Sequence, residues 1–288
     1  MSHRRGAAIA MCILLAPALI AQEIGEVDIL LDRLSQYLAA YESELATVIA
    51  DEHYEQAEYR PLNRANLELL RRRTTISDIA FLRLPDGSAW FGVRDVRSVD
   101  GRPVEANEVR LGELLKRLDQ KAFEQAARIV AESAQYNLGG LRTINMPTTP
   151  LEVLHPVHHV RYVFKIRGGA RIEGHRTRRI DFEEFDEPTI VSGTEGTPVF
   201  IHGSAWVEPD NGRLWRAELT LKPKANPQLA RPVDNRLRVD FTFHPALKMM
   251  VPAQMDETFW IRGGRGQGRA KYSNFRQFTT SARLVPQD

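Results

Sequence analysis

The sequence is poor in the residues that build cross-linked or metal-bound proteins, since it holds one cysteine among 288 residues. A disulfide framework and a multi-cysteine zinc or iron–sulfur site both need several thiols, so both are excluded. It also lacks a Gly-x-Ser-x-Gly elbow and a His-Glu-x-x-His motif. With 43% apolar and 26% charged residues, the chain has a globular composition, which excludes disorder throughout. We expect a fold held by its core, with no catalytic residue, no metal site and no cofactor.

A long hydrophobic run is missing too, because the apolar stretch Ala7–Ile20 contains Pro17 and falls short of the ~20 residues of a membrane-spanning helix. Arg4 and Arg5 precede this stretch, a pattern typical of a secretory signal peptide. The mature chain is then expected to begin near Gln22, after residues 1–21. The cleavage positions on offer follow small residues, namely Ala16, Ala18 and Ala21.

Two alternatives for residues 1–21 are a retained membrane anchor and lipidation of Cys12. Met11 is not the small residue expected before a lipidated cysteine, and the apolar stretch upstream of Cys12 is short. We therefore expect the only cysteine to leave with the signal peptide.

Basic and acidic residues are equal in number once residues 1–21 are removed. The whole chain has 39 basic and 37 acidic residues, and the loss of Arg4 and Arg5 leaves 37 of each. A neutral chain argues against nucleic-acid binding, which normally needs a basic surface. Local clusters remain at Arg71–Arg73 and Arg176–Arg179. We interpret them as solvated strand edges, with an anionic ligand as the alternative.

Two long helices are predicted by apolar residues that recur every three or four positions, the spacing of one helix face. The first covers Ile24–Ile49. The second covers Asn107–Gln135, with a break near Asp119–Lys121. A capping box at Thr149–Glu152 predicts a third, short helix.

Strands are predicted over most of the remaining chain. Thr74–Leu84 and Ala89–Val99 belong to hairpins with Asp-Gly turns, and Thr74–Leu84 has apolar residues on both faces, so both faces should be covered. Seven further strands form an antiparallel meander: Val160–Ile166, Arg179–Phe185, Thr197–Val207, Arg213–Leu221, Arg236–Phe243, Gln254–Ile261 and Arg269–Phe278. We predict an α+β fold with a large antiparallel sheet and helices packed on one face. Residues 22–288 are expected to form one domain, and a split near residue 147 is the alternative.

Three histidines stand close together at His155, His158 and His159 and suggest a metal site at first sight. Pro156 spoils the helical geometry that would join their imidazoles, and no carboxylate nearby has a suitable spacing. We interpret them as structural or solvent-exposed histidines.

Two other stretches have similarly plain interpretations. The acidic run Asp181–Glu187 is expected to be an exposed strand edge rather than a paired-carboxylate site. The glycine-rich run Gly263–Gly268 lacks the Lys-Ser/Thr pair and the following helix of a phosphate loop, so a mobile hairpin loop is expected.

The order of elements and one motif resemble the periplasmic lipoprotein-carrier (LolA-like) fold. The features that carry the resemblance are a signal peptide, an amphipathic helix ending in Asp51–Gln56, early strands, helices laid across the sheet, and a meander that contains the strand–turn–strand Trp206–Leu214 with the pattern W-V-x-P-x-x-G-R-L. The resemblance implies a curved half-barrel closed by helices over an apolar cavity, and it extends to uncharacterised secreted bacterial proteins.

Our leading hypothesis is an exported, non-enzymatic bacterial protein, periplasmic or secreted, that binds a lipid or lipoprotein acyl chain between sheet and helices. Contact with a membrane would be transient at most. A curved sheet can hold such a cleft or fill it with side chains, and alternation alone does not separate the two. The candidate lining residues are Trp215, Leu219, Val239, Phe241, Phe243 and Phe259.

Two other hypotheses remain open. A structural or partner-binding protein with a filled core would bind an envelope protein and expose an apolar patch on the helix Ile24–Ile49. A hydrolase using the histidines of residues 155–159 would need a bound metal.

Overall fold

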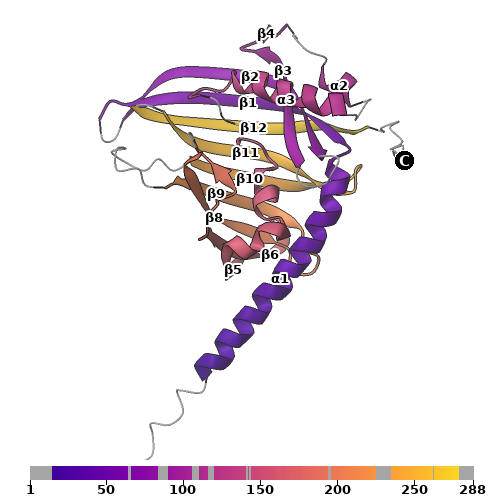
Figure 1. Cartoon of the computed structure of the whole chain (residues 1–288), viewed down its shortest axis with the longest axis vertical. Coiled ribbons are helices and arrows are strands. Elements are labelled where there is room, and N and C mark those ends of the chain that lie inside the picture. The colour runs from indigo at the N-terminus through magenta and orange to yellow at the C-terminus, as the bar shows by residue number, and fades with distance from the viewer. Residues whose placement is uncertain are drawn as a thin grey trace, which may run out of the picture.

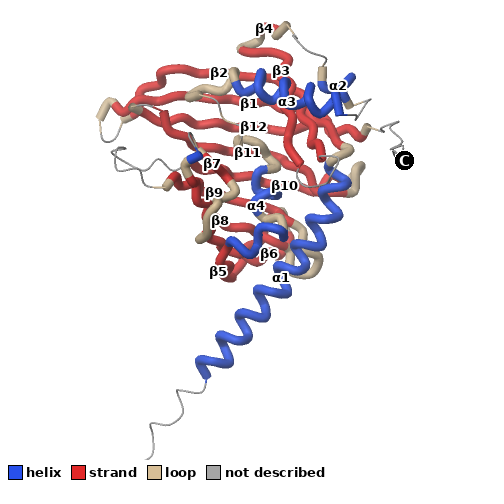
Figure 2. Tube along the Cα trace, in the orientation of Figure 1, coloured by secondary structure: helices blue, strands red, loops and turns tan. Residues whose placement is uncertain are grey.

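The computed structural model describes residues 15–63, 66–83, 90–105, 110–115, 120–140, 142, 144–193, 196–224, 235–261 and 263–278. This part of the chain is built around one antiparallel sheet of twelve strands, with helices packed against it (Figures 1 and 2). The α+β fold class predicted from the sequence is confirmed, and the sheet forms an open half-barrel.

The strands in chain order are β1 (Val48–Pro61), β2 (Leu67–Arg83), β3 (Trp90–Val99), β4 (Arg102–Pro103), β5 (Tyr162–Ile172), β6 (His175–Glu184), β7 (Val191–Ser192), β8 (Pro198–Val207), β9 (Leu214–Pro223), β10 (Asn235–His244), β11 (Met249–Ile261) and β12 (Gly264–Gln277). Their spatial order is β4-β3-β2-β1-β12-β11-β10-β9-β8-β6-β5, and β7 pairs with β8. The first strand therefore pairs with the last, with Tyr54 opposite Ala270.

The helices are α1 (Leu15–Leu45), α2 (Leu111–Leu114), α3 (Gln120–Ala134), α4 (Thr149–Val153) and the 3₁₀ helix η1 (Pro156–Arg161). The N-terminal part of α1 projects away from the sheet, as Figure 1 shows. In the described part of the chain, no helix combines the length and the apolar character that a membrane span requires.

The main core lies between α1 and the sheet. One side of α1 carries a stripe at three- and four-residue steps that is buried against the sheet, which satisfies the helix periodicity in the sequence. These residues are Val27, Leu30, Leu34, Leu38, Tyr41 and Leu45. We call the face of the sheet that α1 covers the inner face. Leu151, Val153 and Leu154, in or just after α4, pack into the same core.

A second, smaller core lies on the opposite, outer face of the sheet. Ile79 and Phe81 of β2 belong to the main core, whereas Ala80 and Leu82 belong to the second one. The second core also contains Val93 of β3 and residues of α2 and α3. Neighbouring strand residues point to opposite faces, so α2 and α3 cover the outer face. The prediction that this strand is covered on both sides is confirmed. The helices, which were predicted on one face of the sheet, pack on both faces.

The helix boundaries differ from those predicted. The first helix ends at Leu45 rather than Ile49, and Asp51–Gln56 lies in β1 instead of ending that helix. The reason is an alternation that begins at Val48, where even-numbered side chains turn inward. The second predicted helix is divided into α2 and α3 near the expected break.

The predicted capping box at Thr149–Glu152 is wrong in detail. Thr148 occupies the N-cap position without a side-chain hydrogen bond, and the Thr149 hydroxyl donates to the carbonyl of Ile144. Of the predicted signal peptide, residues 1–14 lie outside the described residues, and Leu15–Ala21 belong to α1.

Two predictions about strand edges and loops are also wrong. β6, which holds Arg176–Arg179 and most of the acidic run, pairs on both sides, with β5 and β8. Glu184 is buried and accepts hydrogen bonds from the amides of Ile190 and Ile201, each at 3.0 Å. Arg71–Arg73 do lie on an edge, because β3 pairs with β2 only from Thr75 onward.

The glycine-rich run is not a loop, since Gly264–Gly268 begins β12. A Cβ on Gly266 would lie 2.0 Å from the ring of Phe259, and one on Gly268 would lie 2.6 Å from the hydroxyl of Tyr54. Glycine is needed at both positions because large side chains of neighbouring strands occupy the space.

We predict that Gly266→Ala lowers the free energy of unfolding by about 1–3 kcal/mol, because the new methyl group overpacks the Phe259 ring. Urea unfolding measures the loss. Gly112→Ala is the control, since nothing lies within 4 Å of the Cβ position in α2. Equal stability of the two variants would contradict the close packing of β11 on β12.

Candidate functional site

The inner face of the half-barrel is apolar where α1 covers it, and we call this covered surface the groove. Strands β8–β11 supply its floor, including Trp215, Leu219, Val239 and Phe241, each no more than 2% exposed. The covering helix is the first element of the described chain, and its covalent link to the sheet is the short connection from Leu45 to β1. The groove and its cover therefore form the candidate functional site.

The turn between β8 and β9 holds α1 in the groove. Gly212 has a φ of 73°, and a Cβ there would lie 2.1 Å from the carbonyl oxygen of Arg33. The Arg33 guanidinium donates to the carbonyl of Pro209 in the same turn. The motif Trp206–Leu214 thus has a structural role, because only glycine lets this turn approach the backbone of α1.

Side chains around this turn reinforce it. The indole of Trp215 donates to the Glu208 carboxylate at 3.2 Å, and the ring of His175 stacks on Trp215 with centroids 4.3 Å apart. At the N-terminal half of α1, Glu26 forms an ion pair of 2.5 Å with Arg178 of β6. The helix is therefore tied to the sheet at the turn and at one surface ion pair, in addition to its apolar stripe.

The interface beneath α1 also contains polar groups that oppose its burial. The rings of Tyr37 and Tyr41 stack at 5.3 Å, and within the described residues neither buried hydroxyl has a hydrogen-bond partner. Burial raises the pKa of both hydroxyls, so they stay protonated. An unsatisfied buried hydroxyl costs about 1–3 kcal/mol. The attachment of α1 is weaker than its apolar stripe alone suggests.

The six predicted lining residues do not all reach this groove. Trp215, Leu219, Val239 and Phe241 lie together in the main core. Phe259 is buried elsewhere on the inner face, with the Arg142 guanidinium 3.5 Å from its ring centre. The expectation that Phe243 is buried is wrong, because its side chain is 38% exposed and lies beside Arg213 near the end of β10.

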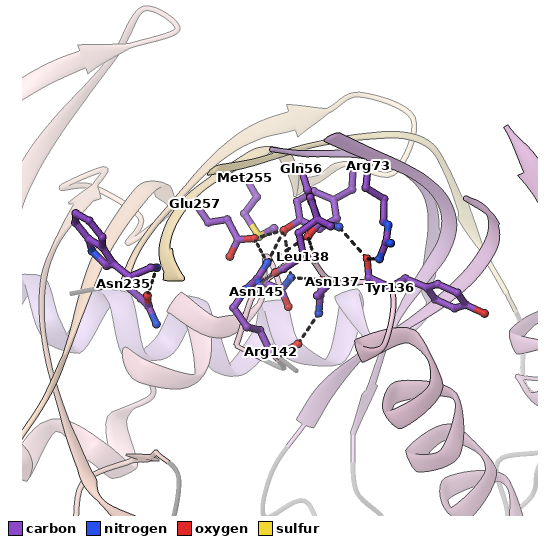
Figure 3. A network of polar contacts seen from close by, with 12 residues as sticks. Gln56, Arg73, Tyr136, Asn137, Leu138, Arg142, Asn145, Asn235, Met255 and Glu257 are labelled. Carbon is purple, nitrogen blue, oxygen red and sulfur yellow. Dashed lines mark hydrogen bonds and ion pairs between the residues drawn. The ribbon is translucent and has the colours of Figure 1, made fainter. Parts of the chain in front are cut away.

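The other half of the inner face is closed by residues 136–140, 142 and 144–146, which we call the strap. Figure 3 shows the polar network that holds it. The side chain of Gln56 donates to the carbonyl of Tyr136 at 3.2 Å and accepts from the amide of Leu138 at 2.9 Å. Arg142 of the strap pairs with Glu257 of β11 at 2.9 Å. The strap is therefore fixed by charged and amide groups, in addition to Met146, which lies in the main core.

A second buried pair lies beside the strap. Arg94 of β3 and Glu52 of β1 form two contacts, at 2.5 and 2.9 Å, and both side chains are at most 5% exposed. Burial by itself disfavours the charge on Arg94, but the Glu52 carboxylate raises its pKa overall. Arg94 also donates to the carbonyl of Asn145 at 2.8 Å. These contacts join the sheet to the strap.

Tyr54 lies at the centre of the network and donates to Glu257. Burial and the neighbouring Glu257 raise its pKa, so the phenol remains a proton donor. Asn145 donates to Tyr54 at 3.3 Å and to Asn137 at 3.0 Å. The arrangement is suited to holding a segment in place.

The three histidines have separate partners. His155 lies 3.5 Å from Glu42 of α1, His158 lies 3.3 Å from Glu152, and His159 contacts the carbonyl of Leu154 at 2.9 Å. Burial lowers the pKa of His159, which favours its neutral form. Among the residues that the structure describes, no group of three or more candidate metal ligands gathers.

Sequence reasoning missed Glu52, Tyr54 and Gln56 because this stretch was assigned to a helix. The available signal was the alternation of these three residues with His53 and Glu55, which is the spacing of one strand face. It predicts a buried polar row once the stretch is recognised as a strand.

The comparisons show likeness in overall arrangement. No protein-family model matches the sequence, and no curated protein matches it. Among solved structures, an outer membrane lipoprotein-sorting protein domain from Vibrio parahaemolyticus is 12% identical with a TM-score of 0.41, covering 87% of this chain and 93% of that one. A DUF1329 family protein from Desulfovibrio piger is 14% identical with a TM-score of 0.37, covering 87% and 92%.

The complex of MucA and MucB from Pseudomonas aeruginosa is a more distant match, with 10% identity and a TM-score of 0.21, covering 86% of this chain and 99% of that one. At these identities and scores the likeness concerns the fold and identifies no ligand. The half-barrel that the sequence resemblance implies is seen in the strand order of this chain's own sheet.

We predict that Gly212→Ala loosens α1. The methyl group would push against the Arg33 carbonyl, which adds about 1–3 kcal/mol of destabilisation to the backbone strain. Gly174→Ala is a matched control, because Gly174 has a φ of 84° and open space around its Cβ position. Hydrogen exchange should show faster exchange across α1 in Gly212→Ala only. Equal exchange in the two variants would contradict the proposed role of this turn.

We predict that Glu52→Ala lowers the free energy of unfolding by about 3–5 kcal/mol, because it leaves the Arg94 charge buried without its carboxylate. Glu68→Ala is the control, since the Arg60–Glu68 pair has a similar contact of 2.6 Å but lies exposed, and its loss costs at most about 1 kcal/mol. Urea unfolding compares the two. A small loss in Glu52→Ala would show that the strap does not depend on this pair.

Proposed function

We propose that this protein is an exported, non-enzymatic, periplasmic binding protein, and that its ligand is an acyl chain of a lipid or lipoprotein that takes the place of α1. The observation that carries the proposal is the apolar groove of the inner face, which is covered by the N-terminal helix α1, with the short helix α4 packed beside it. The ligand would lie on Trp215, Leu219, Val239 and Phe241.

The connectivity supports a removable cover. The helix precedes the first strand, so it can swing about the residues between Leu45 and Val48 without threading through the sheet. The strands that form the groove pair with one another and not with α1. Lifting the helix therefore breaks no strand pairing, and it brings the hydroxyls of Tyr37 and Tyr41 into reach of water.

The free energy that α1 gains by burial in the groove is comparable with the free energy that an acyl chain would gain there. A fully buried leucine contributes about 1.5–3 kcal/mol, so four leucines and Tyr41 together contribute on the order of 10 kcal/mol. An acyl chain of about sixteen carbons gains on the order of 12 kcal/mol at about 0.8 kcal/mol per methylene. An acyl chain can therefore compete with α1, whereas a ligand of a few carbons cannot.

A partner-binding protein with a filled core is the second candidate. It is favoured by the full burial of the groove residues under α1. Its expected exposed patch on the helix Ile24–Ile49 is not what the structure shows, since Val27, Leu30, Leu34 and Leu38 are buried. In the described part of that helix, Ile29 is the large apolar residue that stands out, at 57% exposed.

The test is to lock α1 onto the sheet. Cysteines replace Glu26 and Arg178, whose side chains meet at 2.5 Å, and a short bis-maleimide links them in a Cys12→Ser background. We expect the unlocked protein to bind long-chain fatty acid in native mass spectrometry and the locked protein to lose at least tenfold in affinity. Binding that is equal in both would exclude the groove, and a wild type that binds no acyl chain would favour the filled core.

The matched control links two strands that are already paired. Asp256 of β11 and Arg269 of β12 form an exposed ion pair of 2.7 Å and are direct register partners. The same cross-link there leaves α1 free, so acyl binding should be unchanged. Loss of binding in this control would mean that the reagent, rather than the fixed helix, abolishes uptake.

A further inference from the structure

The end of the β1–β2 hairpin carries a group of exposed apolar side chains. Figure 1 shows this hairpin projecting at the left edge of the molecule, at the far end of the sheet from α2. Isolated exposed leucines are common on proteins, but a contiguous group at a projecting end is not. The exposed residues are Leu62 at 63%, Leu67 at 44%, Leu69 at 47% and Leu70 at 43%.

Strand register extends this group across the sheet. Leu69 pairs with Tyr59, Tyr59 pairs with Arg265, and Arg265 pairs with Trp260. Directly paired residues share a face, so these side chains form one row on the outer face, and Trp260 is 47% exposed. Leu67, opposite Pro61, continues the same face towards the hairpin end. We call these residues, together with Leu62 and Leu70, the hairpin patch.

Basic side chains lie on the same face as the hairpin patch. Arg265 belongs to its row, and the exposed Arg72, which pairs with Ala57, lies in the next row. Glu58 and Glu68 are each paired with an arginine, Glu58 with Arg71 and Glu68 with Arg60. An apolar tip beside outward-facing arginines complements a surface that is apolar within and anionic outside.

We propose that the hairpin patch docks the protein onto the surface of an anionic lipid bilayer. The leucines enter the acyl region, Trp260 lies at the interface, where its ring has an apolar body and a polar N–H, and the arginines contact lipid phosphates. The leucines are spread over a turn, an outer-face row and a β-bulge next to Tyr59 rather than over one flat face. Such a shape suits a fluid bilayer better than the rigid surface of a folded partner.

The docking surface is separate from the acyl groove. The hairpin patch lies on the outer face and at the hairpin end, whereas Trp215 and Phe241 lie on the inner face beneath α1. A bilayer that contacts the hairpin patch does not cover α1. The two proposals can therefore fail independently.

The experiment is vesicle co-flotation of the exported chain as the cell processes it, with its mass determined. The probes are phosphatidylcholine vesicles with and without about one-third phosphatidylglycerol. We expect binding to the anionic vesicles, at least tenfold weaker binding in Leu67→Ser/Leu69→Ser, and weakening at high salt as lipid charge is screened. Tryptophan fluorescence should shift to shorter wavelength on binding. The part of this shift that is lost in Trp260→Phe comes from Trp260.

The matched control is Val157→Ser/Val160→Ser, which changes two exposed valines of η1, at 63% and 82%, away from the hairpin. It should bind vesicles as the wild type does. Circular dichroism checks that both double variants are folded, and fatty-acid binding should be unchanged in both.

Three results would overturn the proposal: wild type that does not float with anionic vesicles, hairpin and control variants that float equally, or flotation that depends on an added envelope protein. Loss of fatty-acid binding with normal flotation would instead count against the acyl groove alone.

Discussion

The pairing of β1 with β12 is the constraint on which the rest of the structure depends. It joins the first strand to the last over most of their length, and it inserts β1 between β2 and β12. Because α1 ends directly before β1, this pairing also fixes where the helix leaves the sheet. The helix then packs on the inner face of the sheet, where it contacts β5 and β11. The position of α1 on the sheet thus follows from the order of the strands.

Two kinds of contact close the inner face, and they differ in how readily they can be exchanged. The strap is held by the Glu52–Arg94 and Arg142–Glu257 pairs, whose buried charges become costly if either partner is lost. The helix is held mainly by apolar area, which another apolar group can replace at similar free energy. The strap therefore stays in place, because its charged contacts are directional. The hydrophobic contact of α1 is non-directional, so α1 is the element that a ligand can replace.

The fold could be predicted where one period dominates. Apolar residues at three- and four-residue steps identified α1, and the predicted strand Arg236–Phe243 corresponds to β10 (Asn235–His244). The strand from Val48 to Gln56 was not predicted, because the inward-facing Glu52 and Gln56 are polar and hide the strand period. Their burial depends on Arg94 and the strap, which are far away in sequence. The strand position of Gly266 was not predicted for the same reason. The side chain that makes glycine necessary there, Phe259, lies on the neighbouring strand. The burial of Trp215, Leu219, Val239 and Phe241 could be predicted because they are apolar. The contact of Gly212 with Arg33 has no local signal.

The distribution of polar and apolar groups also relates the two proposed sites. A protein that exchanges an internal helix for an acyl chain needs that chain to leave a bilayer, and it gains from residence at the bilayer surface. Docking by a few exposed leucines is weak, since each is about half exposed and gains only part of its burial energy. The arginines add attraction that depends on lipid charge and on salt. A contact of this strength is reversible, which is the property required if the loaded protein is to depart from the membrane with its ligand enclosed.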